Sequence, residues 1–227
     1  MSAKRVRSSA FRFFLTARPS AWIAAVLIVS LALTLVTVAS IEAARATPEQ
    51  WQKQVVLVQG DIEEEIFGMK IDEKHFGTGF PINGRIYTCE HVIHEAKNLE
   101  VILKSGQHQK ARLIRSDKAT DLAELAIAHP PKSFQLRSTV PHWFERVWQI
   151  GNPGQMRWVI VNGFFLGFDG AQNCFVIDTF FGNSGSPLLD SRGAVIGMTH
   201  AMVPGTRFTS GGTLQDLRNF IYPDRPR

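Results

Sequence analysis

The sequence predicts an all-β protein, an antiparallel barrel or sandwich that follows an apolar N-terminal segment. Three observations support this fold class. Many short apolar runs are separated by turns rich in Gly, Pro and Asn. The pair Asn83-Gly84 stands between two of these runs and is a strong hairpin signal. Hydrophobic residues make up 44% of the 227 residues and charged residues 20%, so the chain can bury a core.

The N-terminal segment, residues 21–41, is uncharged and largely apolar, and about 20 such residues span a bilayer. Residues 1–20 are basic, which predicts a cytoplasmic tail and export of the chain after the segment. Ala44-Arg45-Ala46 has the small-x-small form of a cleavage site. We therefore expect a single-pass transmembrane signal anchor or, alternatively, the core of a signal peptide that is removed near Ala46.

Both alternatives place residues 47–227 outside the cytoplasm, in the periplasm or the extracellular space. An uncleaved segment would hold the protein in the cell membrane, which then becomes a partner. Residues 42–54 are the expected linker, with Pro48 at an early helical position.

The charge distribution argues against nucleic-acid binding. The formal net charge is +5, but residues 1–46 hold six basic residues and one acidic residue. Basic and acidic residues are equal in number over the rest of the chain. The globular part therefore carries no excess of positive charge that would indicate a nucleic-acid partner.

Two groups of predicted strands form the globular part. The first group, within residues 55–135, comprises 55–59, 62–67, 76–80, 85–88, 99–103, 111–114 and 122–128. The second group, within residues 136–227, comprises 146–150, 157–161, 164–168, 174–179, 186–189, 194–199 and 206–209. The segment 130–141 has no strand pattern and is the expected boundary between the halves. Thr213, with Asp216 three residues later, predicts the N-cap of a short closing helix that ends at Ile221.

A glycine-flanked serine lies in the second half. The turn Gly182-Asn183-Ser184-Gly185-Ser186-Pro187 interrupts an apolar region. Glycines at 182 and 185 permit backbone angles that let neighbouring peptide N–H groups converge on one point. Convergent donors of this kind hold the oxyanion of acyl-transfer reactions. The turn therefore predicts an exposed nucleophile, although Gly-Asn-Ser-Gly also occurs in ordinary turns.

A serine nucleophile needs a base, which in turn needs an orienting group. His91 follows a predicted strand at the start of a helical turn, and Asp121 begins another strand. The chain order His, Asp, Ser is one of the known orders for such a triad.

Four motifs in this order resemble the trypsin-like (chymotrypsin-fold) serine peptidases, especially the bacterial HtrA/Deg type and the glutamyl endopeptidases. They are Gly77-Thr-Gly-Phe80, Thr88-Cys-Glu-His91-Val-Ile, Arg115-Ser-Asp-Lys-Ala-Thr-Asp121-Leu-Ala and Gly182-Asn-Ser184-Gly-Ser-Pro. Ile150-Gly-Asn-Pro-Gly154 and Val195-Ile-Gly-Met also resemble the HtrA type. The resemblance covers roughly residues 76–220.

The resemblance implies two antiparallel six-stranded β-barrels with an active site between them. It implies hydrolysis of peptide bonds in polypeptide substrates through an acyl-enzyme, without a cofactor. His91 would be the general base and acid, Asp121 would orient it, and Ser184 would attack the scissile carbonyl. The backbone N–H groups of Gly182 and Ser184 would form the oxyanion hole.

The sequence also departs from the family pattern. Ser186 replaces the usual glycine of the HtrA type, and Glu90 precedes the histidine, where its charge would favour the imidazolium. No Ile-Val-Gly-Gly activation site occurs, and the chain shows no PDZ pattern after the peptidase motifs. The retained triad favours an active endopeptidase, and the alternative is a catalytically silent peptidase fold that binds or senses polypeptides.

The substrate pocket is not readable from the sequence. By resemblance, the strand after the nucleophile lines it, which makes Met198, Thr199, His200 and Ala201 candidates. Asp178 has the spacing from Ser184 at which trypsin-type enzymes place the acidic residue that selects basic side chains. His200 lies one position later than the histidine with which glutamyl endopeptidases bind acidic side chains. These pointers disagree about the preferred side chain.

Other features have structural interpretations. His91 and His94 could share a helix face as metal ligands, but no third ligand group accompanies them, so we expect no metal. Cys89 and Cys174 could form a disulfide or remain buried thiols. We expect four phenylalanines to lie in the barrel core: Phe164, Phe165, Phe168 and Phe175. The sequence predicts no oligomeric state.

Overall fold

A computed structural model describes residues 23–24, 26–34, 47–66, 69–169, 172–203 and 205–223, without the side chains of 64–66, 69–72 and 169. The chain divides into two units, Met1–Arg45 and Ala46–Arg227. In the first unit the described residues are helical. Within the described residues, no helix is both long and apolar enough to cross a membrane. The rest of the predicted segment 21–41, and the predicted cleavage site before residue 47, lie outside the described residues.

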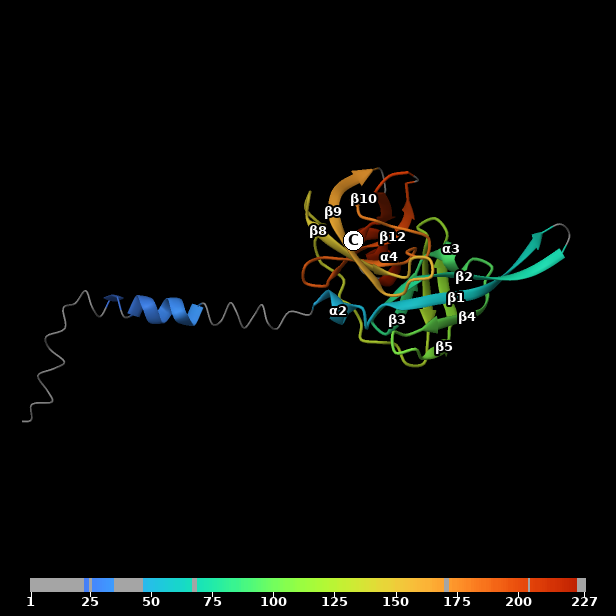
Figure 1. Cartoon of the computed structure of the whole chain (residues 1–227), viewed down its shortest axis with the longest axis horizontal. Helices are drawn as coiled ribbons and strands as arrows, with labels where there is room; N and C mark the ends of the chain where they lie inside the picture. The colour runs from blue at the N-terminus through green and yellow to red at the C-terminus, as the bar shows by residue number, and fades with distance from the viewer. Residues whose placement is uncertain are drawn as a thin grey trace, which may run out of the picture. The chain divides into compact units, whose positions relative to one another are not determined.

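The described residues of the second unit form an all-β structure with three short helices (Figure 1). Its first half contains a seven-stranded antiparallel sheet in the order β5-β4-β1-β2-β3-β7-β6. These strands are β1 (Val56–Ile66), β2 (Met69–Ile82), β3 (Arg85–Thr88), β4 (Lys97–Ile102), β5 (His108–Lys110), β6 (Arg112–Asp117) and β7 (Leu122–Ala126). The hairpin predicted at Asn83-Gly84 is confirmed, since β2 pairs with β3 and the two turn residues have φ of 51° and 74°.

The first half differs from the six-stranded barrel that the family resemblance implies. The edge strands β5 and β6 are consecutive in the chain, and only Ala111 separates them. The Ala111 N–H donates to the Leu99 carbonyl oxygen at 2.8 Å. The segment 108–117 therefore pairs with β4 through its first part and with β7 through its last part, and it counts as two strands.

The predicted second barrel is confirmed as a closed barrel of six strands, in the order β10-β13-β12-β11-β8-β9. The strands are β8 (Arg146–Gly151), β9 (Val159–Asp169), β10 (Gln172–Val176), β11 (Pro187–Leu189), β12 (Val195–Met202) and β13 (Phe208–Gly212). The two strands predicted at 157–161 and 164–168 are one continuous strand, β9, because β8 pairs with it from Val159 to Phe164.

The predicted closing helix is confirmed as α4 (Leu214–Ile221). Thr213 is its N-cap, and the Thr213 hydroxyl accepts the Asp216 N–H at 3.0 Å. Phe220 of α4 packs edge-on against Tyr87 of β3, with ring centroids 6.3 Å apart. Helix α4, which follows the second barrel in the chain, therefore packs against the first sheet and connects the two halves.

The predicted linker, residues 42–54, is described from residue 47 onward. Helix α2 (Pro48–Trp51) begins there, and the Trp51 side chain is only 3% exposed. Its ring lies edge-on to Trp148 of β8 at 6.4 Å between centroids. A Cβ at Gly193 would lie 2.5 Å from the Trp51 ring nitrogen, so only glycine fits opposite it. Trp51 therefore packs α2, at the start of the second unit, against the second barrel.

Of the four phenylalanines predicted in the barrel core, two are buried and two are exposed. Phe165 and Phe175 are fully buried, as expected. The prediction was wrong for Phe164 and Phe168, whose side chains are 40% and 53% exposed. Side chains alternate across a strand, so Phe164 points outward beside buried Phe165. The pairing of β9 with β10 is irregular just before Gly167, so that Phe168 lies opposite the buried Asn173. The Phe168 ring contacts Phe165 at 5.4 Å between centroids and remains exposed to solvent.

Candidate active site

The nucleophile turn lies between β10 and β11, where the chain packs against the first sheet. Gly182 has φ of 93° and Gly185 has φ of 82°, so both need the left-handed freedom of glycine. A Cβ at Gly185 would stand 2.1 Å from the Thr78 carbonyl oxygen, and one at Gly182 would stand 2.3 Å from the Asn152 carbonyl oxygen. The two glycines therefore let the turn approach neighbouring backbone on both sides of Ser184.

His91 and Asp121 lie together, as the sequence predicts. His91 is on helix α3 (Glu90–Ile93), and Asp121 directly precedes β7. One oxygen of the Asp121 carboxylate lies 2.8 Å from His91 Nδ1, and the other accepts the His91 backbone N–H at 3.0 Å. This contact fixes the ring orientation and, with Nδ1 as the protonated atom, leaves Nε2 as the free acceptor.

The surroundings of Asp121 favour its ionised form. Burial opposes ionisation, but the hydrogen bonds from the His91 ring and backbone outweigh it and hold the pKa of Asp121 below its usual value of 3.8. Asp121 also adopts a φ of 52°, which is uncommon for a residue other than glycine. The turn before β7 thus takes a strained conformation that presents the carboxylate to α3.

Ser184 is partly buried, and its hydroxyl group donates to the His200 carbonyl oxygen at 3.2 Å. Within the described part of the chain, that hydroxyl makes no hydrogen bond with His91. The structure thus brings His91 and Asp121 into contact and turns the serine oxygen toward β12. The sequence gives no signal for this side-chain orientation.

The backbone N–H groups of Gly182 and Ser184 are available to a ligand. Among the described residues, neither group donates to a protein acceptor, whereas the intervening Asn183 N–H bonds to the Phe180 carbonyl oxygen at 3.0 Å. Two unpartnered N–H groups around a serine are the arrangement that an oxyanion hole requires.

Thr78 holds the nucleophile turn in place through hydrogen bonds, a role that was not predicted from the sequence. Its side chain is fully buried on β2, its hydroxyl donates to the Gly182 carbonyl oxygen at 2.8 Å, and its N–H donates to the Ser184 carbonyl oxygen at 2.8 Å. The hydroxyl also accepts hydrogen bonds from Asn152. The only sequence signal is the glycine before Thr78: a Cβ at Gly77 would lie 3.0 Å from the Ser184 carbonyl oxygen, so glycine lets β2 approach the turn.

The predicted pocket residues have different environments. Asp178 is exposed and binds Arg207 through both carboxylate oxygens, at 2.7 and 3.0 Å. Thr199 is buried, and its hydroxyl accepts a hydrogen bond from the buried amide of Gln149 at 2.6 Å. Gln149 also bonds to Thr179, just before the nucleophile turn.

The remaining candidates also lie on β12. Met198 is fully buried, whereas Ala201 is exposed. The His200 ring is largely buried against Gly212, and its Nε2 atom has no hydrogen-bond partner within the described residues. Burial lowers the pKa of His200, although the nearby Asp121 charge opposes this shift.

The cysteines do not form a disulfide with each other. The buried Cys89 thiol donates to the Thr199 carbonyl oxygen at 3.2 Å, and burial raises its pKa well above the usual value. Ligand atoms of Cys89, His91 and Asp121 lie within 4.8 Å of one another. His94, considered as a metal ligand with His91, binds Glu90 instead at 2.8 Å. The charge of Glu90 is thus paired with His94 and not with His91.

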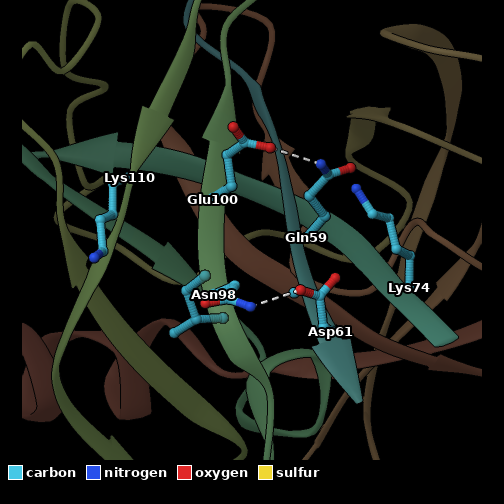
Figure 2. Close-up of a pocket in the computed structure, with 8 residues that line it drawn as sticks. Gln59, Asp61, Lys74, Asn98, Glu100 and Lys110 are labelled. Atoms are coloured by element: carbon cyan, nitrogen blue, oxygen red, sulfur yellow. Dashed lines mark hydrogen bonds between the residues drawn. The ribbon is translucent and has the colours of Figure 1, made fainter. Parts of the chain in front are cut away.

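A separate hollow of about 340 Å³ lies on the first sheet, among β1, β2, β4 and β5. Figure 2 shows that Gln59 bonds to Glu100 and Asn98 to Asp61 across it, at 2.8 and 2.9 Å. None of the predicted site residues lines this hollow. The candidate site is therefore the His91, Asp121 and Ser184 region.

Comparison with known proteins adds independent findings. The family model described as a trypsin-like peptidase domain matches residues 77–198, more than half of the chain. Curated relatives include a probable periplasmic serine endoprotease, DegP-like, of Chlamydia trachomatis, 31% identical over 57% of this chain and 29% of the relative. The Escherichia coli serine endoprotease DegS is 35% identical over 51% of this chain and 36% of the relative. The match to the E. coli periplasmic pH-dependent serine endoprotease DegQ has 31% identity and covers 57% of this chain and 32% of the relative.

The aligned part spans about a third of the length of these curated relatives. Solved structures of similar fold include the active form of a protease from M. tuberculosis, with a TM-score of 0.65 and 22% identity over 74% of this chain and 79% of that one. A serine endoprotease from Yersinia pestis gives a TM-score of 0.66 and 22% identity over 78% of this chain and 66% of that one. At this identity the two structures support the fold alone.

Proposed function

The chain belongs to the trypsin-like peptidase family, and on that premise we propose that it is an exported serine endopeptidase that hydrolyses peptide bonds in proteins. One arrangement carries the proposal: the Gly182 and Ser184 N–H groups have no acceptor among the described residues, and an ionised carboxylate orients His91 on α3. The names of the relatives, all serine endoproteases, support the same reaction class.

The proposed reaction begins with a rotation of the Ser184 side chain away from the His200 carbonyl oxygen. The serine oxygen then attacks the scissile carbonyl carbon while His91 Nε2 takes its proton. The N–H groups of Gly182 and Ser184 hold the oxyanion. When the C–N bond breaks, His91 protonates the leaving amine. His91 then takes a proton from water, whose oxygen attacks the acyl carbon. The ester C–O bond to Ser184 breaks, and His91 returns the proton to the serine oxygen. Asp121 stabilises the imidazolium whenever it forms.

The proposed location is outside the cytoplasm. Residues 21–41 would act as a transmembrane anchor with residues 47–227 on the far side, or as a signal peptide removed near Ala46. Two relatives are named as periplasmic, which supports export. Resistance of the full chain to extraction from membranes by alkaline carbonate would support the anchor, and release into the soluble fraction would contradict it.

The catalytic assignment is tested by hydrolysis of a fluorescently labelled unfolded polypeptide. We expect Ser184→Ala and His91→Ala to reduce turnover by about 10⁴-fold or more, as for other enzymes with this triad. Ser191→Ala, an exposed serine on the turn after β11, should behave as the wild type. Equal turnover by Ser184→Ala and wild type would refute the assignment.

One observation favours the silent alternative, in which the fold binds polypeptides without cleaving them. The serine hydroxyl bonds to the His200 carbonyl oxygen and not to His91, so the resting site is not arranged for attack. Binding of the unfolded polypeptide without any turnover by the folded wild type would support that alternative.

A further inference from the structure

An exposed aromatic surface covers part of the second barrel. We define the aromatic face as Trp143, Phe144, Phe164 and Phe208, with side chains 68%, 69%, 40% and 48% exposed, respectively. Soluble proteins expose single apolar side chains routinely, but contiguous aromatic patches usually mark an interaction site.

The strand register makes this surface continuous. Phe164 of β9 and Phe208 of β13 both lie directly opposite Val176 of β10, so the three side chains share one outward row. Trp143 and Phe144 precede β8, with ring centroids 6.3 Å apart. A Cβ at Gly167 would lie 2.8 Å from the Trp143 ring. The aromatic face thus reaches from the segment before β8 across β9 and β10 to β13.

The chain between the predicted anchor and the barrel limits how far the barrel can move from a membrane. Residue 41 ends the apolar segment, and α2 begins at Pro48. With six residues between them, residues 41 and 48 can be at most about 25 Å apart, which is less than the thickness of a small domain. Helix α2 is fastened to β8 through Trp51 and Trp148, and β8 begins at Arg146, directly opposite Phe164. The tether therefore joins the unit at a strand that borders the aromatic face.

Figure 1 shows β8 and β9 on the side of the second barrel away from the long β1–β2 hairpin. Helix α2 is on the same side of the unit as β8. The tether therefore enters the peptidase unit next to β8, the neighbour of β9.

The chemistry of the aromatic face fits a lipid surface. Trp and Phe rings are favourable at the boundary between headgroups and acyl chains. The Arg146 guanidinium lies 5.9 Å from the centre of the Phe164 ring, where it can contact anionic headgroups while the ring inserts.

We propose that the aromatic face docks the peptidase unit onto the outer surface of the membrane that holds its anchor. This inference rests on the proposed export and anchoring of residues 47–227. Docking would fix the orientation of the unit, so that substrates reach Ser184 from one direction only. A second copy of the chain is the alternative occupant, and it becomes an outcome of the test.

The test uses the fragment 47–227 without the apolar segment, so that binding reports on the aromatic face and not on the anchor. Residues 46–227 form one compact unit that contains both buried cores. The fragment is sedimented with vesicles of phosphatidylethanolamine and phosphatidylglycerol. We expect it to bind, and we expect the double variant W143S/F144S to bind at least about tenfold more weakly, because two exposed aromatic rings no longer enter the interface.

The matched control is the double variant L113S/M156S, whose residues are 40% and 60% exposed but lie outside the aromatic face. It should bind vesicles as the wild type does. Quenching by brominated lipids should reach Trp143, so W143F should lose most of the quenchable fluorescence.

Three results would overturn the proposal: no sedimentation of the folded wild-type fragment with vesicles, equal binding by W143S/F144S, or self-association that W143S/F144S abolishes in the absence of lipid. Turnover of the unfolded polypeptide in solution tests the proposed peptidase activity separately. Carbonate extraction of the full chain tests the anchor. Failure of docking can therefore be distinguished from failure of either of these.

Discussion

Replacing Thr78 with Val tests whether the buried hydroxyl holds the nucleophile turn in place. Valine has nearly the same shape as threonine, so the change removes the hydroxyl without leaving a cavity. Three hydrogen bonds disappear: one to the Gly182 carbonyl oxygen at 2.8 Å and two from Asn152, at 3.0 and 3.1 Å. The Thr78 backbone keeps its bonds to Ser184 and Thr88.

The expected loss follows from these contacts. At about 1 kcal/mol for each hydrogen bond, Thr78→Val should lower the free energy of unfolding by about 3 kcal/mol. For a unit of this size that corresponds to a fall of about 6–12 °C in Tm. The turn that carries the Gly182 and Ser184 N–H groups should also be held less firmly, so turnover should fall at least about tenfold as the oxyanion hole weakens.

The assay is urea unfolding followed by tryptophan fluorescence, together with hydrolysis of the unfolded polypeptide. Thr78→Ser is the matched control, because it keeps the hydroxyl and should retain most of the stability and turnover. If Thr78→Val differed from wild type by less than about 0.5 kcal/mol and cleaved the substrate at the same rate, the bracing role would be refuted.

Three further changes test other contacts. Gly185→Ala should prevent stable folding, because the new Cβ would lie 2.1 Å from the Thr78 carbonyl oxygen. Gly106→Ala is the control: Gly106 has a similar φ but no atom within 4 Å of the new Cβ, so the change should cost only about 1 kcal/mol of stability. Similar unfolding curves for the two variants would contradict this. Burial keeps the pKa of His200 below 6.5 in the folded protein, so below pH 6.5 the unfolded chain binds a proton that the folded chain does not. The free energy of unfolding should therefore fall as the pH drops from 6.5 toward the folded pKa. His200→Gln should flatten this decline, and an unchanged slope would contradict the assignment to His200. Arg207→Ala should release the Asp178 carboxylate and increase cleavage after Lys and Arg in a peptide library. The Tm should change little, because the ion pair is exposed. An unchanged cleavage profile would place Asp178 outside the pocket.

Local chemistry made much of the site predictable. The apolar runs, Asn83-Gly84 and the N-cap at Thr213 predicted elements that depend on neighbouring residues only. His91 and Asp121 could be paired from the order of the motifs, and they lie 2.8 Å apart.

Features that depend on distant contacts were not predictable. The burial of Trp51 requires Trp148 and Gly193, which lie far along the chain. The position of Phe168 opposite the buried Asn173 depends on an irregularity in the pairing of β9 with β10, for which the sequence has no pattern. The orientation of the Ser184 hydroxyl depends on the His200 carbonyl oxygen of β12.

The central claim is that His91 can activate Ser184, and reaction with a fluorophosphonate probe tests it most directly. The probe forms a covalent bond only with an activated serine, and peptide mapping identifies the modified residue. We predict one adduct per chain, on Ser184, and its loss in His91→Ala. A folded protein without an adduct, or equal labelling of Ser184 in His91→Ala, would contradict the claim.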